Sequence, residues 1–420
     1  MSAVTLNEPV DLARRNRRFG FFSLLCAVVM VGVFAMAPPG SRATFVLTDA
    51  RGAAIDIPNL IVGVTPAVLV LTGLVLAVAA VQFTRGFGSR SVIMAGVVAA
   101  LFVAAFLTWA AADANVSLIA LLRGTVRSAT PIALGAMCGV LCERGGTINI
   151  AIEGQLVAAA FTAAVVSTVF SSAWIGLGGG VLAGMLVGAM LALLIIRFRA
   201  DHIVSGVVLW VLCVGTTSFL ATQVLGREAA RFNTPVRFSS IEIPGLSQIP
   251  ILGPVLFRHT VIGYAMFIAV GVLSFALFKT RWGLRLRSVG EHPKAADTVG
   301  IKVLATRYKA VILGGAFAGI GGAWFTLDAT GQFSREMTGG RGFIALAAML
   351  VGRYSPGGAF AAALLFGFAS GLATSVQRLP VPIPSTLMLT APFVVTILVV
   401  AGLVGRLRPP AANGTHYVKE

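Results

Sequence analysis

Apolar runs dominate this 420-residue chain, and many of them extend for about 20 residues, the length that a helix needs to cross a bilayer. Hydrophobic residues make up 57% of the sequence and charged residues only 11%, whereas soluble globular domains carry about 25% charged residues. We therefore predict an all-α, polytopic membrane protein with about 10–12 transmembrane segments, some of them broken or half-length helices.

The basic residues indicate how the chain is oriented. A net charge of +17 would suit nucleic-acid binding if these residues formed one soluble domain, but they alternate with the apolar runs. We place about 21 of the 32 Lys and Arg on one side of the membrane and about nine on the other. Cytoplasmic loops carry the excess of Lys and Arg, so we expect both termini to be cytoplasmic and no nucleic-acid partner.

Residues typical of metal sites or catalysis are sparse. Cys138 and Cys142 are four positions apart, but no third or fourth ligand accompanies them, so we expect no metal site. The predicted spans contain no Ser/His/Asp set and no paired carboxylates. We therefore expect a protein that is not an enzyme.

The N-terminal part is predicted to be an accessory module. Its three spans, at about Phe19–Ala37, Pro58–Phe83 and Ser91–Ala112, contain no charge at mid-membrane. Residues 43–57 alternate apolar and polar side chains, which predicts a small hairpin outside the membrane. We divide the chain into a tail with this module (1–114), a core (115–410) and a second cytoplasmic tail (411–420).

Polar residues enter apolar sequence between Glu143 and Ala160, and three of them are candidates for a substrate pathway: Asn149, Glu153 and Gln155. A carboxylate within a membrane span is energetically costly, so it is a functional candidate by default. Asn149 and Glu153 are four apart and would share one face of a helix, with Gln155 on another. The alternative is that these residues only bond neighbouring helices together.

Two further patterns predict irregular helices and close packing. Thr130-Pro131 resembles a helix start, and Gly342–Gly352 is only about half a bilayer long, so we expect a break at each place. Gly180, Gly184 and Gly188 are spaced by four, which predicts a flat helix face that packs closely on a neighbour.

The longest predicted cytoplasmic loop is Lys279–Lys309, which carries eight Lys and Arg residues. A short helix at Pro293–Val299 would begin after Glu291-His292 and stop at Gly300. An ordinary positive-inside loop needs no such helix. We therefore predict an element that couples the chain to a cytoplasmic partner, formed by Gly290, Glu291, His292, Pro293, Ala295, Ala296 and Gly300.

Four stretches in the same order carry a family resemblance: ERGGTINIAIEGQ, ADHIVSGVVL, TRWGLRLRSVGEHPKAADTVGI and MTGGRGFIALAAMLVGRYSPGGA. Together they resemble the permeases of ABC importers of the ribose and branched-chain amino acid type, most of all the nucleoside or simple-sugar permeases. The likeness covers about residues 120–410. One departure is His292, where this subgroup usually has Asn.

The resemblance implies a nucleoside permease in the bacterial cytoplasmic membrane. Its implied partners are a second, homologous permease, a cytoplasmic ABC ATPase and an extracytoplasmic substrate-binding lipoprotein. The sequence contains no G-x-x-x-x-G-K-[ST] motif, so we expect no cofactor in this chain and ATP and Mg²⁺ bound by the ATPase. Import of ribose-like or other simple sugars is an alternative. An ion-coupled secondary transporter is a weaker one, because only Glu153 stands out as an intramembrane acid.

Overall fold

The computed structural model describes residues 8–48, 57–379, 384, 387–388, 390–402 and 408–418. Ten helices within these ranges are long and apolar enough to cross a membrane. This confirms the predicted all-α, polytopic membrane protein. The chain forms two compact units: Met1–Leu121 with Gln248–Ile251 and Leu372–Leu389, and the remainder.

The first unit contains three long helices and a small sheet. Its elements are α1 (Glu8–Gly32), η1 (Phe34–Met36), β1 (Arg42–Val46), β2 (Leu60–Gly63), α2 (Val64–Thr84), η2 (Gly88–Arg90), α3 (Ser91–Ala110) and β3 (Asn115–Ser117). β1 pairs antiparallel with β2 and parallel with β3. An antiparallel strand pair is present, but β2 lies in residues predicted to begin the second span and not within 43–57, and residues 49–56 lie outside the described residues.

The remaining elements belong to the second unit, except for the first residues of α4, the last residue of η5 and the end of α15, which group with the first unit. In chain order they are α4 (Leu118–Arg144), α5 (Ile152–Val169), α6 (Ala173–Ala192), η3 (Leu193–Arg197), α7 (His202–Leu220), η4 (Ala221–Leu225), α8 (Ala229–Phe232), β4 (Ile241–Glu242), η5 (Leu246–Gln248), α9 (Leu252–Leu256), β5 (Arg258–His259), α10 (Val261–Lys279), α11 (Arg281–Glu291), α12 (Pro293–Thr298), α13 (Val303–Trp324), η6 (Phe325–Thr330), α14 (Arg341–Val351), α15 (Pro356–Val376) and α17 (Ala391–Gly402).

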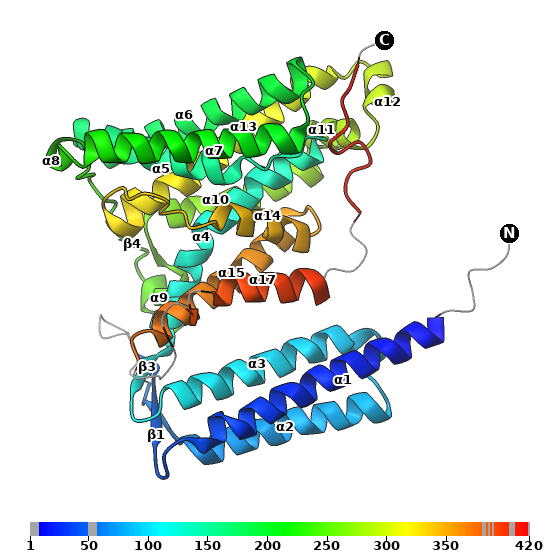
Figure 1. The fold of residues 1–420 in the computed structure, drawn as a ribbon, viewed down its shortest axis with the longest axis vertical. Helices are drawn as coiled ribbons and strands as arrows, with labels where there is room; N and C mark the ends of the chain where they lie inside the picture. The colour runs from blue at the N-terminus through cyan, green and yellow to red at the C-terminus, as the bar shows by residue number, and fades with distance from the viewer. Residues whose placement is uncertain are drawn as a thin grey trace. The chain divides into compact units, whose positions relative to one another are not determined.

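Helices α5, α6 and α13 pack on one another in the upper part of this unit (Figure 1). A Cβ added to Gly184 of α6 would lie 2.3 Å from the Gly315 carbonyl oxygen of α13. A Cβ on Gly322 of α13 would lie 2.3 Å from the Leu156 carbonyl oxygen of α5. The three backbones thus touch directly, which confirms the predicted close packing of the glycine-lined face.

The break predicted at Thr130-Pro131 is wrong, because α4 continues through Pro131 to Arg144. Proline lacks one backbone N–H, but neighbouring helices can satisfy the freed groups in a largely buried span. The Thr130 hydroxyl donates to the Val126 carbonyl (3.0 Å) instead of opening a new helix.

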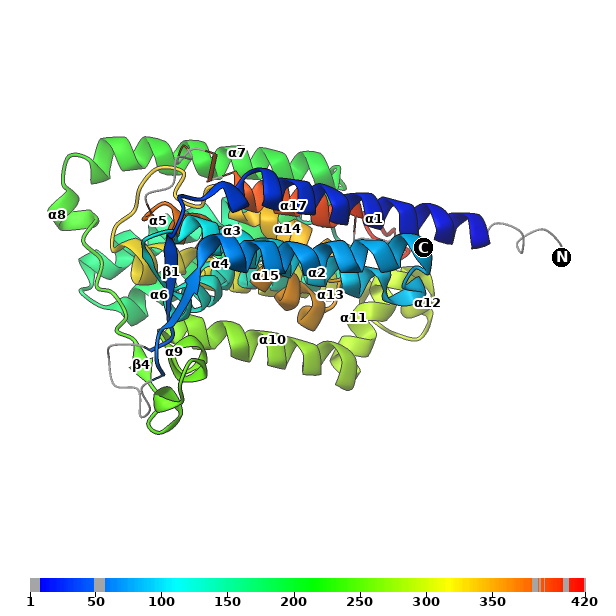
Figure 2. The same cartoon turned by 90° about the horizontal axis from the view of Figure 1, so that it is seen from below.

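Two short helices do follow the prediction. α14 is an 11-residue half-length helix, and α12 begins with Pro293 and is stopped by Gly300, whose φ is +83°. In Figure 2, α11 and α12 lie at one end of α10, and α9 and β4 lie near its other end. The second unit therefore has two distinct ends, one with the predicted coupling element and one with short connecting elements.

Candidate functional site

Glu153 holds the start of the half-length helix α14. It lies in the first turn of α5 and its side chain is 4% exposed. One carboxylate oxygen accepts the Thr338 hydroxyl (2.6 Å) and the Gly340 N–H (2.8 Å), and the other accepts the Gly342 N–H. Since the N-terminus of a helix has unpaired N–H groups and partial positive charge, a carboxylate is stabilised there.

Glycines allow this contact. Gly339 and Gly340 adopt φ of +55° and +76°, values that side chains disfavour, and they turn the backbone N–H groups toward Glu153. A Cβ on Gly342 would lie 2.5 Å from the backbone nitrogen of Glu153. The segment Thr338–Gly342 therefore fits against α5 only with glycine at these positions.

Aromatic and cationic groups surround the start of α14. Arg341 lies over the ring of Phe325, with its guanidinium carbon 5.4 Å from the ring centroid, and donates to the Thr338 carbonyl (3.2 Å). Phe343 meets Trp210 of α7 edge to face, with ring centroids 5.0 Å apart. A carboxylate, an arginine and several rings are groups that can recognise a polar, planar solute.

Asn149 and Gln155 form a separate, fully buried cluster. The Asn149 Nδ2 donates to Gln155 Oε1 (3.2 Å) and lies 3.3 Å from the sulfur of Cys138 and 3.6 Å from that of Cys142. The expected shared face of Asn149 and Glu153 is wrong, because α5 begins only at Ile152 and Asn149 precedes it. Asn149 pairs with Gln155, the residue predicted to point elsewhere.

This cluster keeps some unused hydrogen-bonding capacity. Within the described residues, neither Asn149 Oδ1 nor Gln155 Nε2 has a partner. All four cysteines are free and buried, and the described part of the chain has no group of three His, Cys, Asp or Glu side chains arranged to hold a metal ion. The arrangement is therefore an amide pair next to two thiols.

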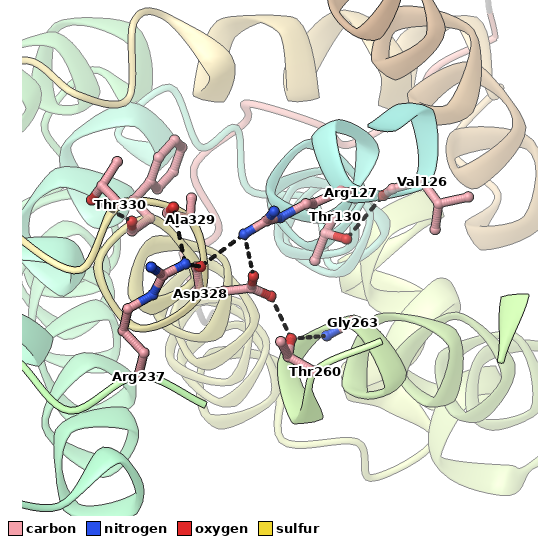
Figure 3. A network of polar contacts seen from close by, with 10 residues as sticks. Val126, Arg127, Thr130, Arg237, Thr260, Gly263, Asp328, Ala329 and Thr330 are labelled. Carbon is pink, nitrogen blue, oxygen red and sulfur yellow. Dashed lines mark hydrogen bonds and ion pairs between the residues drawn. The ribbon is translucent and has the colours of Figure 1, made fainter. Parts of the chain in front are cut away.

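A second buried acid, Asp328, was not identified from the sequence as a site residue. It lies in η6, is 6% exposed, and accepts a hydrogen bond from Arg127 of α4 (2.9 Å) and another from the Thr260 hydroxyl that caps α10 (Figure 3). Arg127 and Arg237 both donate to its backbone carbonyl. Asp328 thus joins three elements distant in sequence.

His259, next to the cap of α10, lies in the same region. Burial lowers the pKa of His259, and the positive charges of Arg123 and Arg127 lower it further, whereas the hydrogen bond with the Val255 carbonyl and the charge of Asp328 oppose this shift. Its Nε2 lies 2.7 Å from the Val255 carbonyl. This contact joins His259 of β5 to Val255 of α9.

The predicted coupling element borders a cavity of about 430 Å³ between α11 and α12. Four of its predicted residues line this cavity: Glu291, His292, Ala295 and Ala296. Gly290 instead packs on α4, where an added Cβ would lie 2.2 Å from the Arg144 carbonyl oxygen. Val299, also in the lining, is 75% exposed.

The far end of α14 is also fixed. The Arg144 Nε donates to the Tyr354 carbonyl (2.8 Å), and Arg353 and Tyr354 adopt positive φ values of 52° and 55°. Burial raises the pKa of Tyr354 to about 12, and the nearby Glu143 adds to the shift while Arg144 opposes it. The half-length helix is thus held by α5 at its start and by α4 at its end.

Comparisons with known proteins give a consistent result. Residues 120–401 match the family model "Branched-chain amino acid transport system / permease component". A guanosine ABC transporter permease protein of Bacillus subtilis is 41% identical over 70% of this chain and 95% of its own length. A nucleoside ABC transporter permease protein of Lactococcus lactis is 38% identical (69% and 94%). A putative glucose ABC transporter permease protein of Haloferax volcanii is 33% identical (71% and 98%). No solved structure matches the chain.

Proposed function

This chain belongs to the family of permease components of branched-chain amino acid transport systems, and we propose that it is the membrane subunit of an ABC importer for nucleosides. The observation that carries the substrate class is the identity of 41% and 38% to permeases named for guanosine and nucleosides, over nearly their whole lengths. The glucose permease at 33% identity makes simple sugars the second candidate.

The source of energy is a partner subunit. ABC permeases work with an ATPase and a substrate-binding partner, and the 420-residue sequence carries no P-loop of its own. In our proposal ATP and Mg²⁺ bind the ATPase, a receptor lipoprotein delivers the solute from outside, and a second homologous permease completes the pathway. The basic loop Lys279–Lys309 favours an orientation with α11, α12 and both termini in the cytoplasm.

The proposed ATPase contact is the cavity between α11 and α12. Support comes from its position at one end of α10 and from the exposed Val299 at its rim. Glu291→Ala should lower transport, because its side chain lines the cavity. The control is membrane insertion, which should be normal. Wild-type ATPase stimulation by substrate in the Glu291 variant would contradict the assignment.

The proposed pathway residues differ in role. Glu153 positions α14, whose first turn carries Arg341 and Phe343, the groups that would face a nucleoside together with Phe325 of η6 and Trp210 of α7. Asn149 and Gln155 retain one unpaired amide atom each, which supports a polar contact to a solute or a water. Asn149→Ala should therefore raise the substrate concentration for half-maximal uptake, whereas Glu153→Gln should lower the maximal rate.

Uptake into proteoliposomes tests the whole proposal. The permease is reconstituted with its partner permease, ATPase and receptor, and entry of radiolabelled guanosine is measured with and without ATP. We expect ATP-dependent uptake that excess adenosine inhibits and excess glucose or ribose does not. Inhibition by the sugars alone would favour a sugar importer, and uptake driven by an ion gradient without ATP would favour a secondary transporter.

A further inference from the structure

Residues 408–418, here called the C-terminal strap, lie across the end of the second unit that carries α11 and α12 (Figures 1 and 2). The Ala412 N–H donates to the Gly290 carbonyl (2.9 Å), and the Ala411 N–H donates to the Glu291 carboxylate (3.1 Å). Tyr417 is buried among Val289, Ala296 and Val303. The strap is therefore packed on both helices of the predicted coupling element.

The same strap also contacts the turn that leads into α5, residues 145–151. The Gly414 N–H donates to the Gly146 carbonyl (3.2 Å), and the Asn413 side chain donates to the carboxylate of Glu143 (2.7 Å), in the last turn of α4 directly before this turn. A Cβ on Gly414 would lie 2.8 Å from Ile148, so the strap passes directly against this turn.

Two further contacts join the strap to α7 and α13. The ring centroids of His416 and His202 are 5.2 Å apart, and His202 Nδ1 in turn accepts the Ile148 N–H (3.1 Å). Arg307, only 3% exposed, donates to the Thr415 carbonyl (2.7 Å). A buried guanidinium needs polar partners, and the Thr415 carbonyl of the strap supplies one to Arg307.

These contacts form one connected path. Its first part is the coupling element, its middle is the strap, and its last part is the turn that carries Asn149 and precedes Glu153. We propose that the C-terminal strap is a positioning element that links movement of α11 and α12 to the 145–151 turn, and so couples ATPase contact to the solute pathway. This role rests on the proposed function of the chain as an ABC permease.

Point variants of the strap test this link in the complete importer. Asn413→Ala removes the bond to Glu143, and Gly414→Ala adds a methyl group at Ile148 with a φ of +74°. We expect the ratio of substrate-stimulated to basal ATPase activity to fall by at least about fivefold, the lower range of coupling between sites. Co-purification of the ATPase with the permease should be unchanged. Either an unchanged ratio or loss of the ATPase would overturn the role, since the latter makes the strap a docking surface.

Matched controls separate coupling from misfolding. Gly40→Ala also places a side chain at a left-handed position, φ +81°, but has open space around it, and should leave the ratio as in the wild type. Glu143→Gln keeps an oxygen that accepts from Asn413 and should retain most of the coupling, whereas Glu143→Ala should not. Loss of coupling in Gly40→Ala, or equal loss in both Glu143 variants, would contradict the specific path.

Amide hydrogen exchange of the isolated permease tests the contact independently of transport. In Asn413→Ala and Gly414→Ala, amides of the 145–151 turn should exchange faster, while those of α6 stay as protected as in the wild type. Unchanged exchange in the turn would refute the link. If the wild-type chain bound no ATPase, the proposed function would fail, and this measurement alone would decide whether the strap positions the turn.

Discussion

The two buried acids of the second unit, Glu153 and Asp328, are stabilised in different ways. Within the part of the chain that the structure describes, Glu153 accepts from neutral donors, Thr338, Gly340 and Gly342, which belong to one short segment at the start of α14. Asp328 pairs with a cation, Arg127, and with the hydroxyl of Thr260, which belong to two different helices. Glu153 thus fixes one half-length helix, whereas Asp328 ties several long elements together.

The burial of the donors determines how much stability is lost when each acid is removed. The donors to Glu153 are backbone and hydroxyl groups that are largely buried, so without the acid they would stay unpaired. Arg127 has 46% of its side chain exposed, so water can solvate its guanidinium in place of the Asp328 carboxylate. We therefore expect Glu153 to matter more for the integrity of the unit than Asp328 does.

The largest effect is expected for Glu153→Ala. Three donors lose their acceptor, and each unpaired buried group costs about 1 kcal/mol or more, so the purified protein should lose roughly 3 kcal/mol of stability. Thermal unfolding in detergent measures this loss. The charge-matched control is Glu336→Ala, an exposed acid in the same connecting segment, which should unfold as the wild type does. If both variants unfolded at the same temperature, the proposed role of Glu153 in holding α14 would be refuted.

Gly342→Ala should have the next largest effect. The new methyl group would lie 2.5 Å from the backbone of Glu153, and such crowding typically destabilises by about 1–3 kcal/mol. Gly357→Ala is the control, because a Cβ there meets nothing within 4 Å and α15 should gain slightly from the better helix former. A Gly342 variant as stable as the control would show that α14 can shift away from α5 at little cost.

Asp328→Asn should have a smaller effect than either substitution. The amide oxygen can still accept from Thr260 or Arg127, but the ion pair is lost, and we expect a loss of about 1 kcal/mol. The decrease in stability should shrink at high salt, since screening already weakens the pair in the wild type. A salt-independent loss as large as that of Glu153→Ala would contradict the distinction between the two acids.

The smallest expected quantity is the pairwise coupling of Arg127 with Asp328. A double-mutant cycle of Arg127→Ala and Asp328→Ala should give an interaction below about 1 kcal/mol, because Arg127 is half exposed and also donates to a backbone carbonyl. The matched cycle of Thr338→Ala and Glu153→Ala should give a larger value. A larger coupling energy for Arg127 with Asp328 than for Thr338 with Glu153 would mean that the ion pair contributes more than the neutral hydrogen bond.

Features set by local chemistry were predicted correctly from the sequence. The proline start and glycine stop of α12, the short length of α14 and the glycine face on α6 each depend on residues close together in the chain. The family resemblance is likewise confirmed by the match over residues 120–401.

Features set by distant partners were not predictable in this way. Asp328 was not identified as a site residue because its partners, Arg127 and Thr260, lie 201 and 68 positions away. The pairing of Asn149 was predicted wrongly because it depended on where α5 begins, and helix starts are the least certain part of a sequence pattern. The roles of Asn149, Glu153 and Gln155 in the pathway, and of the coupling element, stay predictions.

The glycine contacts between α5, α6 and α13 have a mechanical consequence. Where backbone meets backbone, no layer of side chains remains that could change rotamer and let the helices slide. We expect these three helices to move as one rigid body during a transport cycle. The start of α14, which is bonded to Glu153 of α5, would move with them, and we expect the bending at its other end, where Arg353 and Tyr354 adopt positive φ.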